Sequence, residues 1–370
     1  MKKVLFLIHD LGEGGAEKVL INLVNNMDYS KFDVTVMTLF DYGVNKQFLR
    51  KEIHYKFWCK KMFRGNSHLM KLFSPKLLHK LIIKGSYDIE VSYLEGPCAR
   101  VISGCIDKAT KLVSWIHIEQ HSKARVAKSF RSVKEAEYCY NQFNKIICVS
   151  NTVKQDFTSI LNIKVPVDVC YNTNETEQII SLSKEHIDDI KFKSNQINMV
   201  GVGKLLPNKG FDRMINILYR LTNEGYNLHL YVLGIGPQQQ ELEKMIERYS
   251  LQNNVSLLGY RTNPYKYVKN CDLFLCASHA EGFSTAATEA LIVGTPVCTV
   301  EVSGMKEMLG ENNEYGVVVN NDDMSLYKAI KELLDNQDKL KYYTTKALER
   351  GKYFSTEKTV SIVEKMLLNL

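Results

Sequence analysis

The chain has 370 residues, of which 45% are hydrophobic and 24% are charged, and its formal net charge is +7. These proportions are typical of a globular protein, and the length predicts two domains of roughly 150–200 residues rather than one core. No run of residues approaches the ~18 apolar residues of a transmembrane helix. The apolar start of the chain ends at His9 and Asp10, which is too early for a secretory signal, so a first β-strand is predicted there instead.

The nine cysteines form no Cys-x-x-Cys pair, and most of them lie inside apolar runs. An odd number of cysteines in such positions is typical of buried thiols in a reducing compartment. It argues against a disulfide framework or a zinc site. The expected location is therefore the cytoplasm.

Positive charge is concentrated in the first half of the chain. Residues 1–180 contain 26 Lys and Arg against 18 Asp and Glu, whereas residues 181–370 contain 22 against 23. Residues 46–80 alone contain ten basic residues and one acid, with aromatic and aliphatic side chains between them. Two interpretations stay open for this basic segment: a solvated helical face, or a surface that lies on anionic lipid. No nucleic-acid partner is expected, because no recognisable binding motif is present.

Strand-like apolar runs alternate with helical patterns along the whole chain. Strands are predicted in the first half at residues 4–8, 34–38, 89–92, 112–116, 146–149 and 169–171. Strands are predicted in the second half at residues 199–202, 228–233, 255–258, 273–276, 297–300 and 317–319. Helical spacing of apolar residues predicts helices over 19–27 and 214–221, the second of which is expected to end at Gly225.

This alternation predicts an α/β protein with parallel sheets and helices on both faces. Two such sets in series predict two Rossmann-like domains. The first is expected to cover residues 1–175 and the second residues 190–351, with a polar stretch near residues 172–195 between them. The segment 352–370 is predicted to be an amphipathic helix.

The most informative stretch follows the predicted strand 273–276. It places two carboxylates, Glu281 and Glu289, eight residues apart, with a predicted helix from Thr285 to Val293. Backbone N–H groups at such a helix start point toward an anion. The two carboxylates are placed to hold the hydroxyls of a sugar and of a ribose.

The loop after the predicted strand 199–202 contains Gly203, Lys204 and Lys209 and precedes a helix. Two lysines five residues apart can neutralise a diphosphate as point charges. Two ordinary solvated lysines fit the same spacing.

The next two strands are followed by a glycine turn and by a polar pair of residues. Gly234 and Gly236 follow the strand 228–233, and Tyr260 and Arg261 follow the strand 255–258. The crevice outside such strand ends is where open α/β sheets bind ligands, so a nucleotide base beside Tyr260 and Arg261 is one interpretation. A tight turn and a plain strand exit are the alternatives.

In the first half, Gly14 and Gly15 lie in a glycine-rich loop between the first strand and the first helix, where the backbone can approach a ligand closely. The loop is not the dinucleotide fingerprint, because Glu17 stands where the third glycine is needed, and a plain tight turn fits as well. His117 follows the strand 112–116 at the same sheet edge. It lies four residues before His121, but no third metal ligand is evident, which leaves a structural or a substrate-contacting histidine.

Together these motifs resemble the family 4 retaining glycosyltransferases of the bacterial surface-polysaccharide type. The G-K-L-x-P-N-K-G-F loop and the E-G-F-x-x-x-x-x-E stretch carry most of the resemblance, which extends over essentially the whole chain. It implies the GT-B fold, with two Rossmann-like domains facing each other across a cleft and a C-terminal helix that crosses back to the first domain. The first domain would bind the acceptor and the second the donor.

The resemblance also implies roles for individual residues. Lys204 and Lys209 would bind the donor diphosphate, although the family more often has Arg at the position of Lys204. Glu281 would contact the transferred sugar, and Glu289 the ribose. The backbone N–H groups of Gly282, Phe283, Ser284 and Thr285 would hold phosphate oxygens. The resemblance would place His117 near the sugar, and Gly14 and Gly15 near the phosphate and the acceptor.

The implied reaction transfers a hexose or N-acetylhexosamine, with retained anomeric configuration, from a nucleotide-sugar, with UDP preferred, to a saccharide or lipid-linked saccharide. No cofactor or metal is expected, since no D-x-D motif stands out and cations and a helix start can stabilise the leaving group. The enzyme would work in the cytoplasm on the inner face of the membrane. The rival interpretations are a nucleotide-sugar 2-epimerase on the same fold and a membrane-surface protein without catalysis.

Overall fold

A computed structural model describes residues 1–370 except Glu13, Arg64 and Ser194. The chain divides into two compact units: a first unit of Met1–Asn174 with Thr356–Leu370, and a second unit of Glu175–Ser355. Each unit contains one sheet in which all paired strands are parallel. The predicted α/β class is therefore confirmed.

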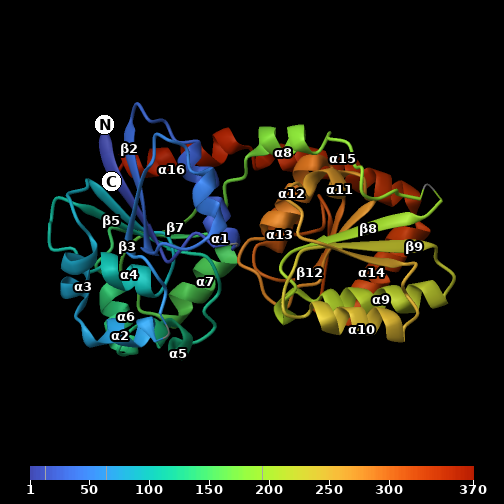
Figure 1. Ribbon diagram of the computed structural model, residues 1–370, viewed down its shortest axis with the longest axis horizontal. Helices are drawn as coiled ribbons and strands as arrows, with labels where there is room; N and C mark the ends of the chain where they lie inside the picture. Colours follow the sequence, from blue (N-terminus) through green and yellow to red (C-terminus); the bar gives the residue numbers. More distant parts are fainter. Residues whose placement is uncertain (13, 64, 194) are drawn as a thin grey trace. The chain divides into compact units, whose positions relative to one another are not determined.

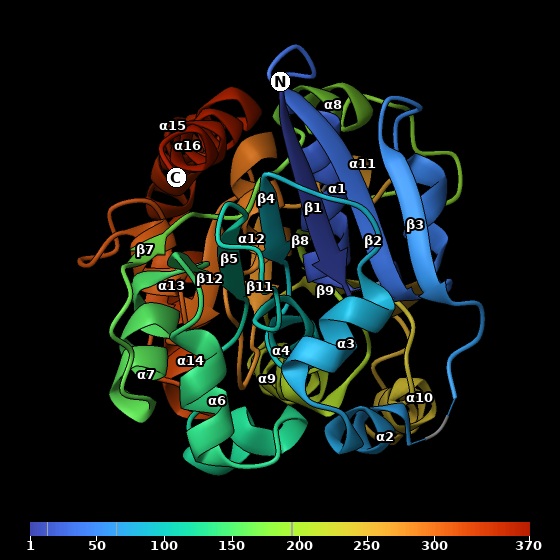
Figure 2. The same ribbon diagram turned by 90° about the vertical axis from the view of Figure 1, so that its left-hand side faces the viewer.

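The first sheet has seven strands in the order β3-β2-β1-β4-β5-β6-β7, and Figure 2 shows most of them side by side. They are β1 (Lys2–Ile8), β2 (Phe32–Phe40), β3 (His54–Cys59), β4 (Ile89–Ser92), β5 (Lys111–Ile116), β6 (Lys145–Cys148) and β7 (Val167–Val169). Val4 of β1 lies between Val34 of β2 and Ile89 of β4. The strand order reverses between β1 and β4, which is where open parallel sheets bind ligands.

Helices cover both faces of the first sheet (Figure 1). One face carries α1 (Gly15–Asn25) and α16 (Thr356–Leu368), and the other carries α3 (Pro75–Ile82), α4 (Pro97–Ile102), α6 (Val133–Tyr140) and α7 (Asn151–Ile160). The shorter elements are η1 (Val44–Phe48), α2 (Asn66–Leu72), α5 (Lys123–Val126) and η2 (Ala127–Ser129). A serine side chain accepts a backbone N–H at the start of α3, α5, α6 and α7, which stabilises each start by about 1 kcal/mol.

The C-terminal helix α16 belongs to the first unit, as the resemblance implied. Glu364 accepts the backbone N–H of Asp28 at 2.6 Å, and Lys2 Nζ donates to the carbonyl of Leu367 at 3.2 Å. The helix begins at Thr356, four residues later than residue 352, because Lys352 lies in the last turn of α15 (Gln337–Tyr353), which belongs to the second unit.

The second sheet has six strands in the order β10-β9-β8-β11-β12-β13. They are β8 (Ile197–Val202), β9 (Leu228–Leu233), β10 (Val255–Gly259), β11 (Leu273–Cys276), β12 (Val297–Val300) and β13 (Val317–Val319). One face carries α9 (Phe211–Asn223), α10 (Gln239–Arg248) and α14 (Asp323–Asp335), and the other carries α8 (Thr176–Leu182), α11 (Tyr265–Lys269), α12 (Thr285–Val293) and α15 (Figure 1). Two short elements, η3 (Pro207–Lys209) and α13 (Met305–Leu309), complete it.

Two parts of the fold differ from the sequence-based expectation. The second unit begins at Glu175 rather than residue 190, because α8 packs on α12 and Asp189 pairs with Arg261 at 2.9 Å. The basic segment 46–80 is not one helical face, because residues 54–59 form the exposed edge strand β3, paired with β2. The rest of that segment contains η1, α2 and α3.

Gly210 joins η3 to α9 and lies directly against the end of β11. Its φ is +67°, and a Cβ atom added there would lie 2.1 Å from the carbonyl oxygen of Ala277. The buried guanidinium of Arg213 donates to the same carbonyl oxygen at 3.0 Å. Because the close approach leaves no room for a side chain, glycine at position 210 is what allows the loop after β8 to lie on β11.

We expect Gly210→Ala to lower the free energy of unfolding by at least about 3 kcal/mol, since left-handed backbone strain of roughly 1–2 kcal/mol is joined by a steric clash. Gly225→Ala is the matched control: its φ is +93°, but nothing lies within 4 Å of the added Cβ, so only the backbone strain applies. Calorimetry on the two variants measures the difference. Equal losses would show that the contact with Ala277 is not tight.

Candidate functional site

The predicted donor-site residues gather at the carboxyl ends of β8 and β11, which are neighbours at the strand-order reversal of the second sheet. Lys209 Nζ lies 2.6 Å from Glu281 Oε1, and Ser278 Oγ donates to the same oxygen at 2.7 Å. Both side chains of the ion pair are largely shielded from solvent, at 27% and 12% exposed. The backbone N–H of His279 donates to the carbonyl of Asn208 at 2.8 Å, so the two loops are also tied through their backbones.

The start of α12 lies in the same loop as Glu281. Ser284 caps the helix by accepting the N–H of Ala287 at 3.3 Å, and Thr285 is its first residue, as predicted. Gly282 and Phe283 are buried, and the Phe283 ring packs on Phe354 with 5.7 Å between centroids. The helix therefore has a fixed start, and backbone N–H groups at a helix start favour an anion.

Glu289 is the fifth residue of α12 and is only 6% exposed. A carboxylate at this depth costs free energy unless polar groups or a ligand satisfy it. Its position one turn into the helix agrees with the predicted one.

The glycine turn after β9 packs tightly on the loop after β8. A Cβ on Gly234 would lie 1.8 Å from the carbonyl oxygen of Gly203, and one on Gly236 would lie 2.4 Å from that of Leu205. The backbone N–H of Gly234 donates to Gly259 at 2.9 Å. Gly234 and Gly236 are therefore required because a side chain at either position would clash with the loop after β8. The turn also brings the carboxyl ends of β8, β9 and β10 together.

The remaining predicted residues of the second unit differ in whether their side chains are already engaged by other residues. Lys204 is exposed and makes no side-chain hydrogen bond or ion pair within the described part of the chain. Tyr260 is 55% exposed. Arg261 is engaged, because its guanidinium pairs with Asp189 and lies over the Tyr267 ring at 5.9 Å. A base bound at this strand end would meet Tyr260 more readily than Arg261.

His117 follows β5 in the first unit and is held by two neighbours. Its backbone N–H donates to Glu95 Oε2 at 3.1 Å, and its ring lies 4.9 Å from the Tyr93 ring. Burial lowers the pKa of His117 to about 4, although a hydrogen bond with the Tyr93 backbone opposes the shift. The buried Nε2 atom has no hydrogen-bond partner among the described residues, so a neutral imidazole keeps one ring nitrogen available to a substrate.

The side chain of His121 is grouped with those of Glu119 and Asp156, and its Nδ1 atom lies 3.7 Å from Asp156 Oδ1. Gly14 and Gly15 lie at the start of α1, where Gly14 is the N-cap residue and Gly15 the first helical residue. The preceding turn is closed by a hydrogen bond from Gly12 N–H to Asp10 at 2.8 Å, and Glu13 lies outside the described residues.

Three residues that support the predicted side chains within the two units were not predicted. Ser278 supports Glu281, Arg213 anchors the end of β11, and Glu95 holds His117. Glu95 could have been identified from the sequence, since it follows the predicted strand 89–92 and precedes a Gly-Pro helix start. Arg213 could not have been identified, because in the sequence it is one of several polar residues on an amphipathic helix.

Two family models match the two halves of the chain. Residues 13–178 match the model of Glycosyltransferase Family 4, and residues 183–350 match that of glycosyl transferases group 1. Together the two models cover most of the chain.

The chain is 28% identical, over the full length of both proteins, to a Campylobacter jejuni enzyme named N-acetylgalactosamine-N,N'-diacetylbacillosaminyl-diphospho-undecaprenol 4-alpha-N-acetylgalactosaminyltransferase. It is 22% identical to the lipopolysaccharide core biosynthesis glycosyltransferase LpsD of Rhizobium meliloti, over 89% of this chain and 87% of that one. Among solved structures, Anabaena HepE in complex with UDP superposes with a TM-score of 0.78 at 20% identity, over the whole of both chains. This likeness confirms the expected GT-B fold.

His117→Asn should change how stability depends on pH. The unfolded histidine takes up a proton near pH 6.5 and the native one only near pH 4, so native stability falls as the pH drops through this window. Between pH 7 and pH 5 the native protein should lose about 2 kcal/mol through His117, and the variant should be spared that loss. Urea unfolding followed by tryptophan fluorescence reports on the first unit, which contains both Trp58 and Trp115. An identical pH dependence in the two proteins would mean that His117 is not buried as described.

Proposed function

The chain belongs to the family 4 glycosyltransferases, and we propose that it moves a hexose or N-acetylhexosamine from a UDP-sugar to a lipid-linked saccharide in surface polysaccharide biosynthesis. The observation that carries the proposal is the contact of Lys209 with Glu281 beside the start of α12. The choice of UDP is supported by the complex of HepE with UDP, and the choice of acceptor by the diphospho-undecaprenol in the name of the Campylobacter relative.

The donor half of the reaction needs positive charge where the nucleoside diphosphate leaves. Lys209 has three ammonium protons, so it can hold Glu281 and a phosphate oxygen at the same time. Lys204 and the N–H groups at the start of α12 would hold further oxygens. Such preorganised charge is usually the largest catalytic contribution.

We propose that the sugar is transferred with retention and without a metal ion. The Glu281 oxygen that meets Lys209 and Ser278 already accepts two hydrogen bonds, which makes it a poor nucleophile. Glu281 would instead hold the hydroxyls of the transferred sugar, and the acceptor would attack on the face that the diphosphate leaves. The acceptor's proton would pass to the leaving phosphate, while the two lysines supply the charge that a metal otherwise provides.

The basic segment 46–80 supports a peripheral position on the membrane. Large apolar side chains are exposed along it, including Phe57, Met62, Phe63, Leu69 and Leu72. Exposed lysines alternate with them along the segment, which therefore offers both apolar contact and attraction to anionic lipid. Within the described residues no helix is both long and apolar enough to span a bilayer.

Substitutions of Glu281 and of Glu289 are expected to affect turnover and UDP binding differently. Glu281→Gln should lower turnover by about 100-fold or more, because a contact to the reacting sugar is lost, while the affinity for UDP stays near that of the native protein. Glu289→Ala should weaken UDP binding, because the ribose contact is lost. Calorimetric titration with UDP and an assay of UDP release separate the two effects. The opposite pattern would mean that the roles are reversed.

Membrane binding should depend on Lys60 and Lys61. Reversing both charges to Glu should weaken sedimentation with phosphatidylglycerol vesicles by at least about tenfold, since each basic residue near an anionic surface contributes about 1 kcal/mol. Lys244→Glu with Lys328→Glu is the charge-matched control, on exposed helix positions of the second unit. Arg64, which belongs to the same basic segment, lies outside the described residues. Unchanged binding of the Lys60 and Lys61 variant would overturn the membrane role.

A further inference from the structure

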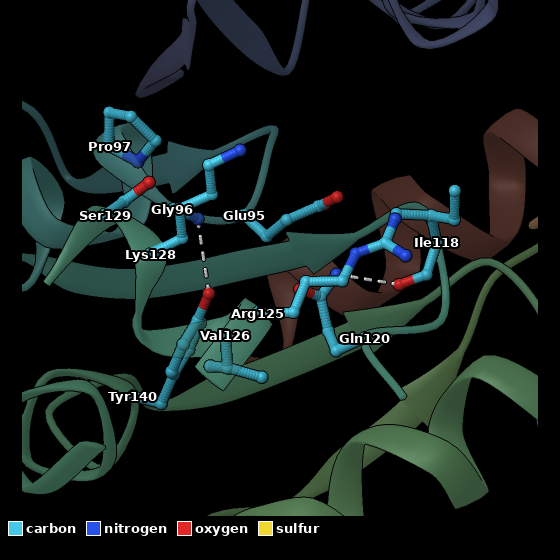
Figure 3. Close-up of a pocket in the computed structure, with 10 residues that line it drawn as sticks. All are labelled: Glu95, Gly96, Pro97, Ile118, Gln120, Arg125, Val126, Lys128, Ser129 and Tyr140. Carbon is cyan, nitrogen blue, oxygen red and sulfur yellow. Dashed lines mark hydrogen bonds between the residues drawn. The ribbon is translucent and has the colours of Figure 1, made fainter. Parts of the chain in front are cut away.

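The first unit contains a cavity of about 180 Å³ that is lined in part by Glu95 and by Ile118, the residue after His117. Its walls come from the loop between β4 and α4, from the chain that follows β5, and from α6, all within the first unit (Figure 3). Pockets for drug-sized ligands are larger, at roughly 300–1,000 Å³. The size therefore suits a single sugar unit better than a whole nucleotide-sugar.

The inner part of the cavity offers both an acceptor and a donor of hydrogen bonds. Glu95 already receives the backbone N–H of His117, and burial raises the pKa of its carboxyl while the charge of Arg125 lowers it. Tyr140 is 1% exposed, and its hydroxyl oxygen accepts the N–H of Gly96 at 3.3 Å. Its own proton has no acceptor among the described residues, so it can be donated to a ligand oxygen. A carboxyl and a buried hydroxyl donor are suited to the alcohol groups of a sugar.

The outer part of the cavity is cationic. Arg125 of α5 and Lys128 of η2 line it and are exposed to solvent. Neither side chain makes a hydrogen bond or an ion pair with any residue that the structure describes. Glu95 is the one carboxyl among the lining residues, so two positive charges face one acid. Arginine and lysine left unpaired beside a pocket are suited to phosphate oxygens, which arginine binds with two parallel hydrogen bonds.

We propose that this pocket binds the phosphate-bearing sugar of the acceptor, with Arg125 and Lys128 on the phosphate and with Glu95 and Tyr140 on the sugar hydroxyls. The inference rests on the proposed transfer to a lipid-linked saccharide, and it identifies where such an acceptor is recognised. It makes Arg125 and Lys128 specificity-determining residues, because a neutral sugar of the same shape leaves both charges unpaired. The contact between Glu95 and His117 links the pocket to the histidine whose Nε2 atom is unpartnered.

The test is a titration of the full-length chain, first saturated with UDP, with three probes: N-acetylglucosamine 1-phosphate, N-acetylglucosamine and inorganic phosphate. The sugar phosphate should bind at least about tenfold more tightly than either fragment, because only it engages both parts of the pocket. Arg125→Gln and Lys128→Gln should each weaken it by about tenfold. Lys123→Gln is the matched control, because Lys123 is an exposed residue of the same short helix and does not line the pocket.

The outcomes separate this inference from the proposed function. Equal affinity for the sugar phosphate and for inorganic phosphate would reduce the pocket to an anion site and overturn the inference, as would equal weakening by the Lys123 variant. The UDP affinity of all three variants should remain native, since they lie outside the donor unit. A chain that binds no UDP would instead contradict the proposed function, and the same probes titrated without UDP would still decide whether the pocket binds a sugar phosphate.

Discussion

The proposed donor site depends on one close approach of backbone to backbone, that of Gly210 to the carbonyl of Ala277. Because residue 210 has no side chain, the loop after β8 lies on the end of β11, and Arg213 fixes the same carbonyl from α9. The contact joins the two strands at which the order of the second sheet reverses. Lys209 precedes that glycine and Glu281 follows that strand, so their 2.6 Å ion pair is a consequence of the backbone contact. A flexible loop bearing the same lysine would lose more conformational entropy on binding a diphosphate.

In the proposed reaction, the second unit provides positive charge and the first unit provides a neutral histidine. The second unit presents Lys204, Lys209 and the start of α12, which in the proposed reaction would together oppose the charge that develops on a departing nucleoside diphosphate. The first unit presents a neutral histidine, because burial lowers the pKa of His117 to about 4. A neutral imidazole does not compete with the lysines for phosphate, and it can accept or donate one hydrogen bond to a sugar hydroxyl. The cationic residues Arg125 and Lys128 are then left for the acceptor, whose own phosphate needs them.

The sequence predicted the parts of the fold whose side chains are buried. The run from Leu273 to Cys276 is fully buried, and the helix that follows it begins and ends at the predicted residues. The strand β3 was missed, because an edge strand with exposed lysine and histidine lacks an apolar run. The partner of Arg261 was missed because Asp189 is 72 residues away, and no local pattern pairs the two. For the same reason the pocket lined by Glu95, Arg125 and Tyr140 could not be predicted, although His117, which contacts Glu95, was predicted as a site residue. Local periodicity thus predicts elements and strand ends, whereas pairings across the fold require the structure.

The most direct test of the central claim is the thermal stability of the full chain with UDP, GDP or ADP, each in the presence and absence of EDTA. A ligand at about 100 times its dissociation constant stabilises the native state by about 2.7 kcal/mol. A site built on Lys204, Lys209 and the start of α12 should give that stabilisation with UDP, undiminished by EDTA. Stabilisation that EDTA abolishes would contradict the metal-free arrangement, and no response to any nucleotide would contradict a donor site at the ends of β8 and β11.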